Sequence, residues 1–334
     1  DGGVTTNGGI ADSVVSKDDN TSHQQPTPSA PTTTIQTTIQ TTIQTAIHTT
    51  RTGGIVIEGT SGSTGISLAT LCTQRGHSII VVMPDDQAKE KQSILNCLGA
   101  IVHIVPNASI SNAGHYVNVA RRIALDINQR NYGSDDDDRT TTKPPIQAAF
   151  MNQFENESNY QAHVETTGPE LWNQTNRQID VFCMSSGTGA TLSGVGRYLK
   201  DQSIQEIAAA ETATGRNGRR RRQRPCQIIL VDPPGSVLYN KVKYNVAYAT
   251  QQRERNLLRH RYDTIAEGIG LDRITRNFAL GVERGVIDDA IRVSDQEAVD
   301  MAHWLLRYEG LFVGSSSAMN VVGALQMAIR NGDD

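Results

Sequence analysis

Glycines and hydroxyl-bearing residues gather where one apolar stretch ends and a helical pattern begins. Residues 58–65 (Glu-Gly-Thr-Ser-Gly-Ser-Thr-Gly) follow the apolar run 55–57 and precede a helical pattern through Leu71. A strand, a tight turn and a helix start expose backbone amides at the helix N-terminus, and glycines let a ligand approach them closely. The chemistry that fits is binding of a carboxylate or phosphate, although an ordinary strand-to-helix loop has the same outline.

A second loop of this kind follows the apolar residues 179–184, which read as a buried strand. Residues 185–191 (Ser-Ser-Gly-Thr-Gly-Ala-Thr) lead into a helix expected over 190–200. Amides and hydroxyls at a helix start are what a phosphate cradle requires. The loop lacks the Gly-Lys-Ser/Thr of a Walker motif and the full dinucleotide-binding fingerprint.

Two further segments complete the set. Residues 310–318 again combine an apolar stretch, a turn of small polar residues and a helix start, with Ser316 in the turn. A serine at this position is also a common helix N-cap, so a cofactor contact and a cap are both open for Ser316. The short segment 267–270 (Glu-Gly-Ile-Gly) contributes Gly268.

Strand and helix patterns alternate along the rest of the chain, which predicts parallel sheets with helices packed against them. The expected strands are 78–83, 101–105, 179–184 and 227–231, and the expected helices are 62–75, 87–98, 111–128, 190–200, 295–308 and 318–330. The predicted fold class is therefore α/β. A length of 334 residues suits two such units.

Composition excludes several classes of protein. The net charge of −4 gives no general attraction for nucleic acid or anionic membranes. The 4 cysteines have no paired metal-ligand spacing, so we expect no metal site. Three of them sit within apolar stretches, which favours buried, reduced thiols. No apolar run approaches the roughly 20 residues of a membrane helix.

Low-complexity segments interrupt the pattern. Residues 1–52 carry a Thr-Thr-Ile-Gln repeat, which we expect to be a disordered insert because threonine opposes helix and apolar residues are sparse. Further inserts are expected at 133–145, 211–225 and 239–261. The Asp run 135–138 and the Arg run 219–222 favour solvated loops over a metal site, a nucleic-acid site or a localisation signal.

Taken in order, these segments resemble the cysteine synthase (O-acetylserine sulfhydrylase) family of fold type II pyridoxal-phosphate enzymes. Residues 60–65 resemble the family's Thr-Ser-Gly-Asn-Thr-Gly loop, and 187–191 resemble its Gly-Thr-Gly-Gly-Thr loop. Residues 152–156, with His163 and 166–170, are similar to its Gln-Gln-Phe…His…Thr-Thr-Gly-Pro-Glu segment. The resemblance covers about 53–329 and looks closest to the fungal mitochondrial branch.

The resemblance implies a two-lobed fold of open, mostly parallel sheets flanked by helices. A smaller domain (53–150) would hold the substrate-carboxylate loop, and a larger one (151–330) the phosphate loop. It implies that pyridoxal 5'-phosphate contacts Ser63, Gly187, Thr188, Gly189, Ala190, Thr191 and Ser316. The substrate would contact Thr60, Ser61, Gly62, Thr64, Gln153 and Gly268. The implied reaction is β-replacement of O-acetylserine, or a similar O-activated serine, by sulfide to give L-cysteine, in a homodimer.

The chain departs from the family pattern at several points, one of which is Asn-Glu-Ser-Asn at 156–159 in place of Asn-Pro-Ala-Asn. Ser63 replaces an asparagine and should weaken one cofactor contact, and Ala190 replaces a glycine, which is harmless only at negative φ. The family's Schiff-base lysine precedes an apolar helix, whereas Lys17, the only lysine upstream of Glu58, precedes a polar stretch. We expect the chain to begin downstream of the true lysine, with Lys17 as the alternative catalytic residue.

Other functions remain open. A catalytically inactive relative could bind a ligand or partner through the same cleft. Within the fold, cystathionine β-synthase and serine/threonine dehydratase are the alternatives. The expected location is mitochondrial or cytoplasmic, with any N-terminal targeting segment outside this sequence.

Overall fold

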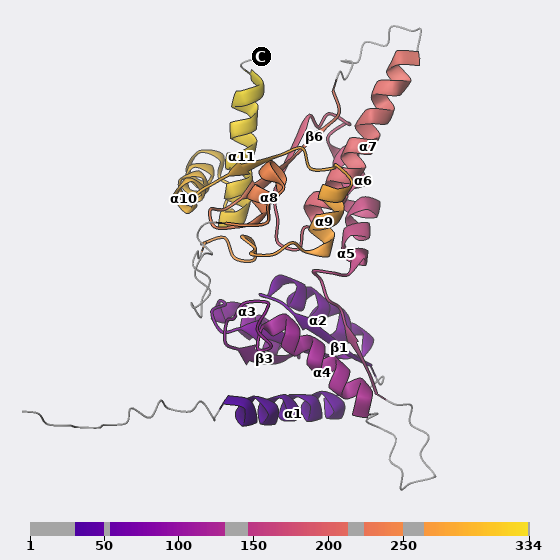
Figure 1. Ribbon diagram of the computed structural model, residues 1–334, viewed down its shortest axis with the longest axis vertical. Helices are drawn as coiled ribbons and strands as arrows, with labels where there is room; N and C mark the ends of the chain where they lie inside the picture. The colour runs from indigo at the N-terminus through magenta and orange to yellow at the C-terminus, as the bar shows by residue number, and fades with distance from the viewer. Residues whose placement is uncertain (1–30, 50–53, 131–145, 213–223, 250–263, 333–334) are drawn as a thin grey trace, which may run out of the picture. The chain divides into compact units, whose positions relative to one another are not determined.

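The structure is a computed structural model that describes residues 31–49, 54–130, 146–212, 224–249 and 264–332 (Figure 1). The chain divides into two compact units, residues 1–38 and 39–334, and the sheets described below belong to the second unit. Among the described residues, no helix is long and apolar enough to cross a membrane.

The first sheet has four parallel strands in the order β3-β2-β1-β4. They are β1 (Gly54–Gly59), β2 (Ser78–Pro84), β3 (Ile101–Val105) and β4 (Gln147–Phe150). Strand β2 is buried along its whole length, which explains why its sequence is a continuous apolar run. The register pairs Ile57 with Ile80 and with Phe150. The carboxyl ends of these parallel strands therefore lie at one edge of the sheet.

Helices supply two separate apolar clusters around this sheet. Helices α2 (Ser63–Arg75) and α3 (Lys89–Cys97) contribute Cys72 and Leu95 to a cluster with Val81. Helix α4 (Tyr116–Arg130) contributes Ile123 to another cluster with Ile80. Because Ile80 and Val81 point to opposite faces of β2, the two clusters lie on opposite faces of the sheet.

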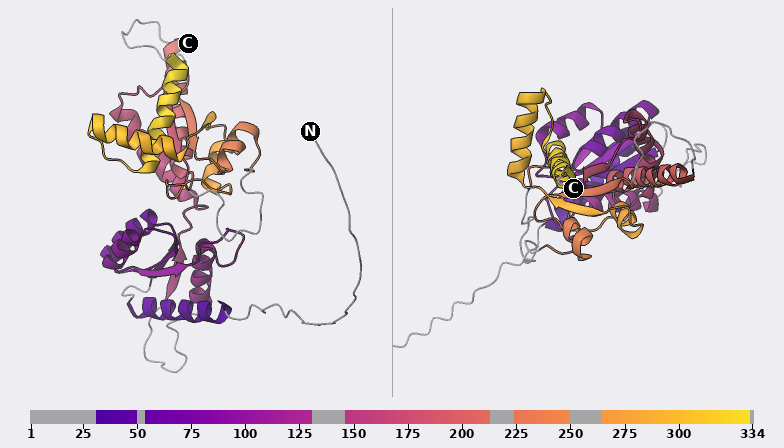
Figure 2. Two further views of the ribbon diagram at one scale, coloured as in Figure 1. Left: turned by 90° about the vertical axis from the view of Figure 1, so that its left-hand side faces the viewer. Right: turned by 90° about the horizontal axis from the view of Figure 1, so that it is seen from above.

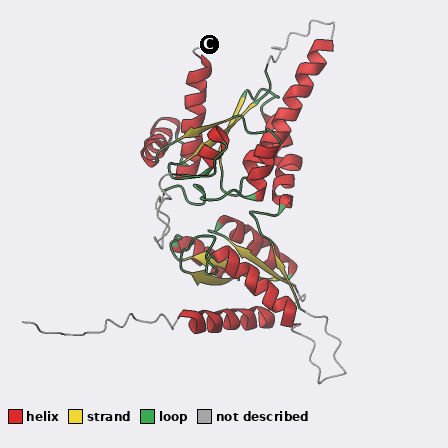
Figure 3. Ribbon diagram, viewed as in Figure 1, coloured by secondary structure: helices red, strands yellow, loops and turns green. Residues whose placement is uncertain are grey.

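The second sheet has three parallel strands in the order β5-β6-β7, and helices again lie against it (Figure 3). The strands are β5 (Val181–Ser185), β6 (Gln227–Asp232) and β7 (Asp289–Arg292). Its first cluster contains Leu192 and Phe278, and its second contains Met319. The helices are α5 (Glu157–Ala162), η1 (His163–Thr167), α6 (Gly168–Gln174), α7 (Ala190–Thr212), α8 (Leu238–Tyr244), α9 (Arg276–Glu283), α10 (Asp295–Trp304), η3 (Leu305–Glu309) and α11 (Ser315–Gly332). Helices α10 and α11, in yellow, contact each other (Figure 2).

The prediction of parallel sheets flanked by helices is confirmed. The expected division near residue 150 falls between the two sheets and stays a prediction. Residues 1–30 and the Asp and Arg runs lie outside the described residues. The expected insert at 239–261 begins inside helix α8, whose Leu238 is fully buried.

The prediction of disorder over 1–52 is wrong for residues 31–49, which form helix α1 (Pro31–Thr49). Ile43 and Ala46 are fully buried and join the cluster that contains Ile123. Packing of a few apolar residues therefore outweighs the low helix propensity of threonine. The hydroxyl of Thr45 also donates to the carbonyl oxygen of Thr41, at 3.0 Å, so the threonines add hydrogen bonds within the helix.

Replacing Ile43 by alanine is expected to lower the free energy of unfolding by about 2–4 kcal/mol, because it leaves a cavity in a packed cluster. The neighbouring exposed Gln44 is the matched control, and Gln44→Ala should change stability by less than about 0.5 kcal/mol. Urea unfolding followed by circular dichroism measures both. Equal effects of the two substitutions would show that α1 does not pack as described.

Candidate cofactor and substrate site

Residues 185–191 connect the end of β5 to the start of α7, as the sequence predicts, and their backbone geometry requires glycine. Gly189 has φ +85, and a Cβ there would lie 2.5 Å from the Cβ of Phe278. A Cβ on Gly187 would lie 2.5 Å from the carbonyl oxygen of Gly268. Ala190 is not among the described residues with positive φ, so alanine fits where the family has glycine.

Neighbouring elements hold this loop in place. The hydroxyl of Thr275, which caps α9, donates to the carbonyl oxygen of Thr188 at 2.6 Å. The side-chain amide of Asn159 donates to Thr188 Oγ1 at 3.3 Å. Thr191 Oγ1 lies 3.1 Å from Nε2 of His163. Two hydroxyls are thus fixed at the N-terminus of a helix of 23 residues.

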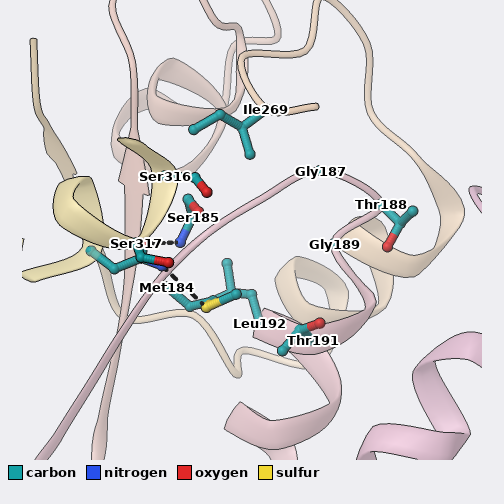
Figure 4. A pocket seen from close by; sticks show the side chains of 11 residues that line it. Met184, Ser185, Gly187, Thr188, Gly189, Thr191, Leu192, Ile269, Ser316 and Ser317 are labelled. Carbon is teal, nitrogen blue, oxygen red and sulfur yellow. Dashed lines mark hydrogen bonds between the residues drawn. The ribbon is translucent and has the colours of Figure 1, made fainter. Parts of the chain in front are cut away.

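A pocket of about 230 Å³ brings this loop together with the start of α11 (Figure 4). The residues that line it are Met184, Ser185, Gly187, Thr188, Gly189, Thr191, Leu192, Ile269, Ser316, Ser317 and Asn320. Five of the seven predicted cofactor contacts lie in this one pocket. Ala190 is adjacent in the chain, and Ser63 is exposed at the start of α2 and does not belong to the described lining.

Ser316 is the second residue of α11, inside the helix and not at its N-cap position, and it lines the pocket. The alternative that Ser316 caps the helix is therefore not supported. Its neighbour Ser315 instead donates to the carbonyl oxygen of Ile265 at 2.9 Å. Ser316 is left available for a ligand.

Sequence reasoning missed Asn320, which also lines the pocket. Its Oδ1 accepts the backbone N–H of Ser185 at 2.7 Å and so ties α11 to the end of β5. The sequence did contain a clue to Asn320, because it follows Ser316 by four residues and so lies on the same helix face. The supporting contacts of Asn159 and Thr275 have no such local signal.

The chemistry of the pocket suits a phosphate group attached to an organic ring. The first backbone amides of α7 have no acceptor within the helix, although the Ala190 N–H donates to Thr188 Oγ1 at 3.3 Å. With the hydroxyls of Thr188 and Thr191, such amides are donors for an anion. The helix dipole adds favourable electrostatics. Met184, Leu192 and Ile269 give an apolar wall. These residues fit pyridoxal 5'-phosphate.

The predicted substrate loop forms a hydrogen-bonded unit with Gln153. Thr60 is buried, and its Oγ1 accepts the backbone N–H of Gly62 at 3.1 Å. Thr64 Oγ1 donates to Oε1 of Gln153 at 2.6 Å, and Nε2 of Gln153 donates to the carbonyl oxygen of Gly59 at 3.0 Å. The structure therefore joins residues about 90 positions apart that the sequence assigned to one carboxylate site.

Glu58 lies directly before this loop and is almost fully buried. Burial raises the pKa of its carboxyl to about 7, against the lowering effect of hydrogen bonds from the Gln153 and Asn152 backbone. Glu58 Oε2 has no hydrogen-bond partner in the described residues. With a pKa of about 7, a large fraction of this carboxyl is protonated at neutral pH, which lowers the free-energy cost of burying it.

Gly268 adjoins both loops. Its φ is +84, its carbonyl oxygen is close to Gly187, and a Cβ added to it would lie 3.5 Å from Oγ of Ser61. The adjacent Glu267 forms an ion pair with Lys91, whose side chain lies against Gly62. The predicted substrate contacts Ser61, Gly62 and Gly268 are therefore neighbours.

The predicted catalytic residue Lys17 lies outside the described residues. None of the lysines in the described ranges lines the pocket. Within those ranges no cluster of three or more His, Cys, Asp and Glu side chains is placed to hold a metal ion.

A family model described as "Pyridoxal-phosphate dependent enzyme" matches residues 17–334. The chain belongs to this pyridoxal-phosphate-dependent family. Its cofactor is therefore pyridoxal 5'-phosphate, for which the pocket at the start of α7 has suitable donors.

Comparison with curated proteins shows which members of this family the chain resembles. "Cysteine synthase 2" of Schizosaccharomyces pombe is 43% identical over 279 residues, covering 83% of this chain and 62% of the relative. A Saccharomyces cerevisiae protein named "Putative mitochondrial cysteine synthase" is 42% identical over 275 residues, covering 82% and 62%. "Cystathionine beta-synthase" of Apis mellifera is 32% identical over 277 residues, covering 83% and 44%. The chain thus spans less than two thirds of the length of these relatives.

Proposed function

We propose that the protein catalyses a β-replacement that makes L-cysteine from O-acetylserine, or a similar O-activated serine, and sulfide. The observation that carries the proposal is that one pocket is lined by Gly187, Thr188, Gly189, Thr191 and Ser316, beside the loop in which Thr64 bonds to Gln153. The similarity to fungal cysteine synthases supports it over the other reactions of the family.

The residues have separate tasks in this reaction. When bound, pyridoxal 5'-phosphate supplies an electron sink for the bonds at the substrate's α-carbon. Thr188, Thr191 and the α7 amides hold the phosphate. Thr60, Ser61, Thr64 and Gln153 hold the substrate carboxylate, and Gly268 leaves room for the substrate.

Ser316 would contact the ring nitrogen of the cofactor. A neutral hydroxyl does not hold that nitrogen protonated as a carboxylate would. The cofactor's capacity to stabilise a carbanion is then limited, which suits loss of a leaving group at Cβ better than transamination. The pocket's serine thus supports β-replacement.

A base must remove the proton at the substrate's α-carbon. The resemblance to the family implies that this base is the lysine that anchors the cofactor. Lys17, the only lysine upstream of Glu58, is the alternative that this chain offers for that base. To test it, the protein is incubated with pyridoxal 5'-phosphate, reduced with borohydride and digested, and the labelled lysine is identified among its seven lysines. Label at Lys17 alone supports the assignment. Scattered label would show that Lys17 is not the anchor.

Gln153→Ala is expected to raise the KM for O-acetylserine about 10-fold, because one hydrogen bond to a carboxylate contributes about 1.5–3 kcal/mol. The matched control is Gln174→Ala, since Gln174 is exposed on α6 and bonds only to Glu170 among the described contacts. Steady-state kinetics measures both variants. An unchanged KM for Gln153→Ala would remove this residue from the carboxylate site.

We also propose a homodimer and a mitochondrial location, the latter from the name of the yeast relative. Sedimentation of the purified protein tests the first, and microscopy of a fluorescent fusion of the full coding sequence tests the second. A monomer, or fluorescence confined to the cytoplasm, would contradict them.

A further inference from the structure

His163 connects the phosphate loop to a neighbouring π-helical turn. It is the first residue of η1, and π-helical turns occur often at functional sites. Its Nε2 lies 3.1 Å from Oγ1 of Thr191, and its Nδ1 lies 3.0 Å from Oγ1 of Thr167. The imidazole therefore bridges two threonine hydroxyls, one of which lines the pocket.

Helix α7 is held against this histidine at close range. A Cβ on Gly194 would lie 2.8 Å from the Cβ of His163 and 2.6 Å from the carbonyl oxygen of Tyr160. Glycine at this position lets α7 approach the turn closely enough for the Thr191 contact. The contact is thus built into the packing of two elements and does not depend on an exposed rotamer.

The hydrogens in this network can be counted. Burial lowers the pKa of His163 below its ordinary value, so at neutral pH the ring has one N–H and one lone pair. If Nδ1 carries the hydrogen, the single hydroxyl hydrogen of Thr191 is used on Nε2. If Nε2 carries it, the ring donates to Thr191, whose own hydrogen is then free.

Thr167 favours the second arrangement. Its hydroxyl hydrogen has no acceptor other than Nδ1 among the described contacts of this side chain. If Nδ1 carried a hydrogen, the Thr167 hydrogen would have no acceptor among its described contacts and would depend on water at a half-buried position. Donation from Thr167 to Nδ1 leaves the hydrogen on Nε2.

We propose that His163 is a positioning residue that donates from Nε2 to Thr191 and so directs the Thr191 hydroxyl hydrogen toward a phosphate group in the pocket. This rests on the proposed placement of the cofactor phosphate at residues 187–191. His163 does not touch the phosphate. Because Thr191 Oγ1 then accepts a hydrogen bond from His163, its own hydrogen remains available to donate to the phosphate.

The tautomer can be measured directly. Long-range 1H–15N correlation spectra of the protein distinguish the two neutral forms of histidine, and the His163 signals are assigned by their loss in His163→Gln. The proposal predicts the form with hydrogen on Nε2. Hydrogen on Nδ1 would overturn it, whatever the affinity of the pocket.

Affinity for pyridoxal 5'-phosphate and for inorganic phosphate gives a second readout. His163→Ala should weaken binding of both about 10-fold, whereas His163→Gln, whose amide can donate near the Nε2 position, should stay within about 3-fold. In a Thr191→Ala background, His163→Ala should have almost no further effect. Additive effects would overturn the proposal, because they indicate a general structural role.

The same measurements separate this inference from the proposed function. If Thr191→Ala weakens binding while His163→Ala does not, the phosphate site stands and the role of His163 fails. If the unmodified protein binds neither probe, the proposed function fails and the role of His163 with it. Circular dichroism of each variant identifies any that does not fold, and the tautomer of the unmodified protein then decides.

Discussion

Replacing Thr188 and Thr191 together by alanine is expected to abolish retention of pyridoxal 5'-phosphate. Both side chains line the pocket at the start of α7. A hydrogen bond to a charged group contributes about 1.5–3 kcal/mol, so losing two should weaken binding about 10²–10⁴-fold. The measurement is the cofactor's absorbance that remains with the protein after gel filtration, together with a titrated Kd.

The matched control is Thr175→Ala. Thr175 is exposed beyond the end of α6, and its hydroxyl donates to the Leu171 carbonyl oxygen at 2.7 Å, away from the pocket. Cofactor affinity should be unchanged in this variant. Unchanged affinity in the double variant at 188 and 191 would refute the phosphate assignment.

The second large effect is a loss of stability with rising pH. Burial raises the pKa of Glu58 from 4.5 to about 7 and that of Asp232, at the end of β6, from 3.8 to about 7. A carboxyl whose pKa is raised by folding binds its proton more tightly in the folded state. The free energy of unfolding should therefore fall as pH rises from about 4 to about 7 and level off above, by roughly 3–4 kcal/mol for each carboxyl.

Glu58→Gln and Asp232→Asn test this, because the amides resemble the protonated acids at every pH. In urea unfolding, Glu58→Gln should match the unmodified protein near pH 3, where the carboxyl is protonated in both the folded and the unfolded state, and exceed its stability near pH 8. Asp232→Asn should do the same. The exposed Glu165 supplies a control, since Glu165→Gln should leave the pH dependence unaltered. Parallel curves for all three variants would contradict the account of the buried carboxyls.

Long apolar runs made most of the sheet predictable. β2 and β6 were expected from continuous apolar stretches, which are typical of strands covered on both faces. Strands β4 and β7 were missed. Each has only 4 residues and lies at the edge of its sheet, so neither carries a long apolar signal. Their pairing depends on the strand beside them.

Helix α1 was not predicted, for a different reason. Threonine-rich sequence has little intrinsic tendency to form a helix, and the sequence indicated disorder. Burial of Ile43 and Ala46 against residues of α4 and the first sheet stabilises it instead. Such long-range packing has no local signature in sequence.

The candidate site was more predictable than the fold around it. Gly187, Thr188, Gly189, Thr191 and Ser316 were expected from motifs, and the structure places them in one pocket. The contacts that hold them depend on how the helices pack: Thr275 was not expected at the site, and His163 was matched to a motif without its contact to Thr191 being predicted. A motif predicts which groups meet a ligand, and packing determines how they are oriented.

The most direct test of the central claim is synthesis of L-cysteine by the protein from its full coding sequence, loaded with pyridoxal 5'-phosphate. O-acetyl-L-serine and sulfide are supplied, and cysteine and acetate are quantified. Parallel reactions contain serine with homocysteine, or serine or threonine alone. The account predicts equal amounts of cysteine and acetate, with the other reactions much slower. Cofactor binding without cysteine formation, or faster formation of cystathionine or a keto acid, would contradict it.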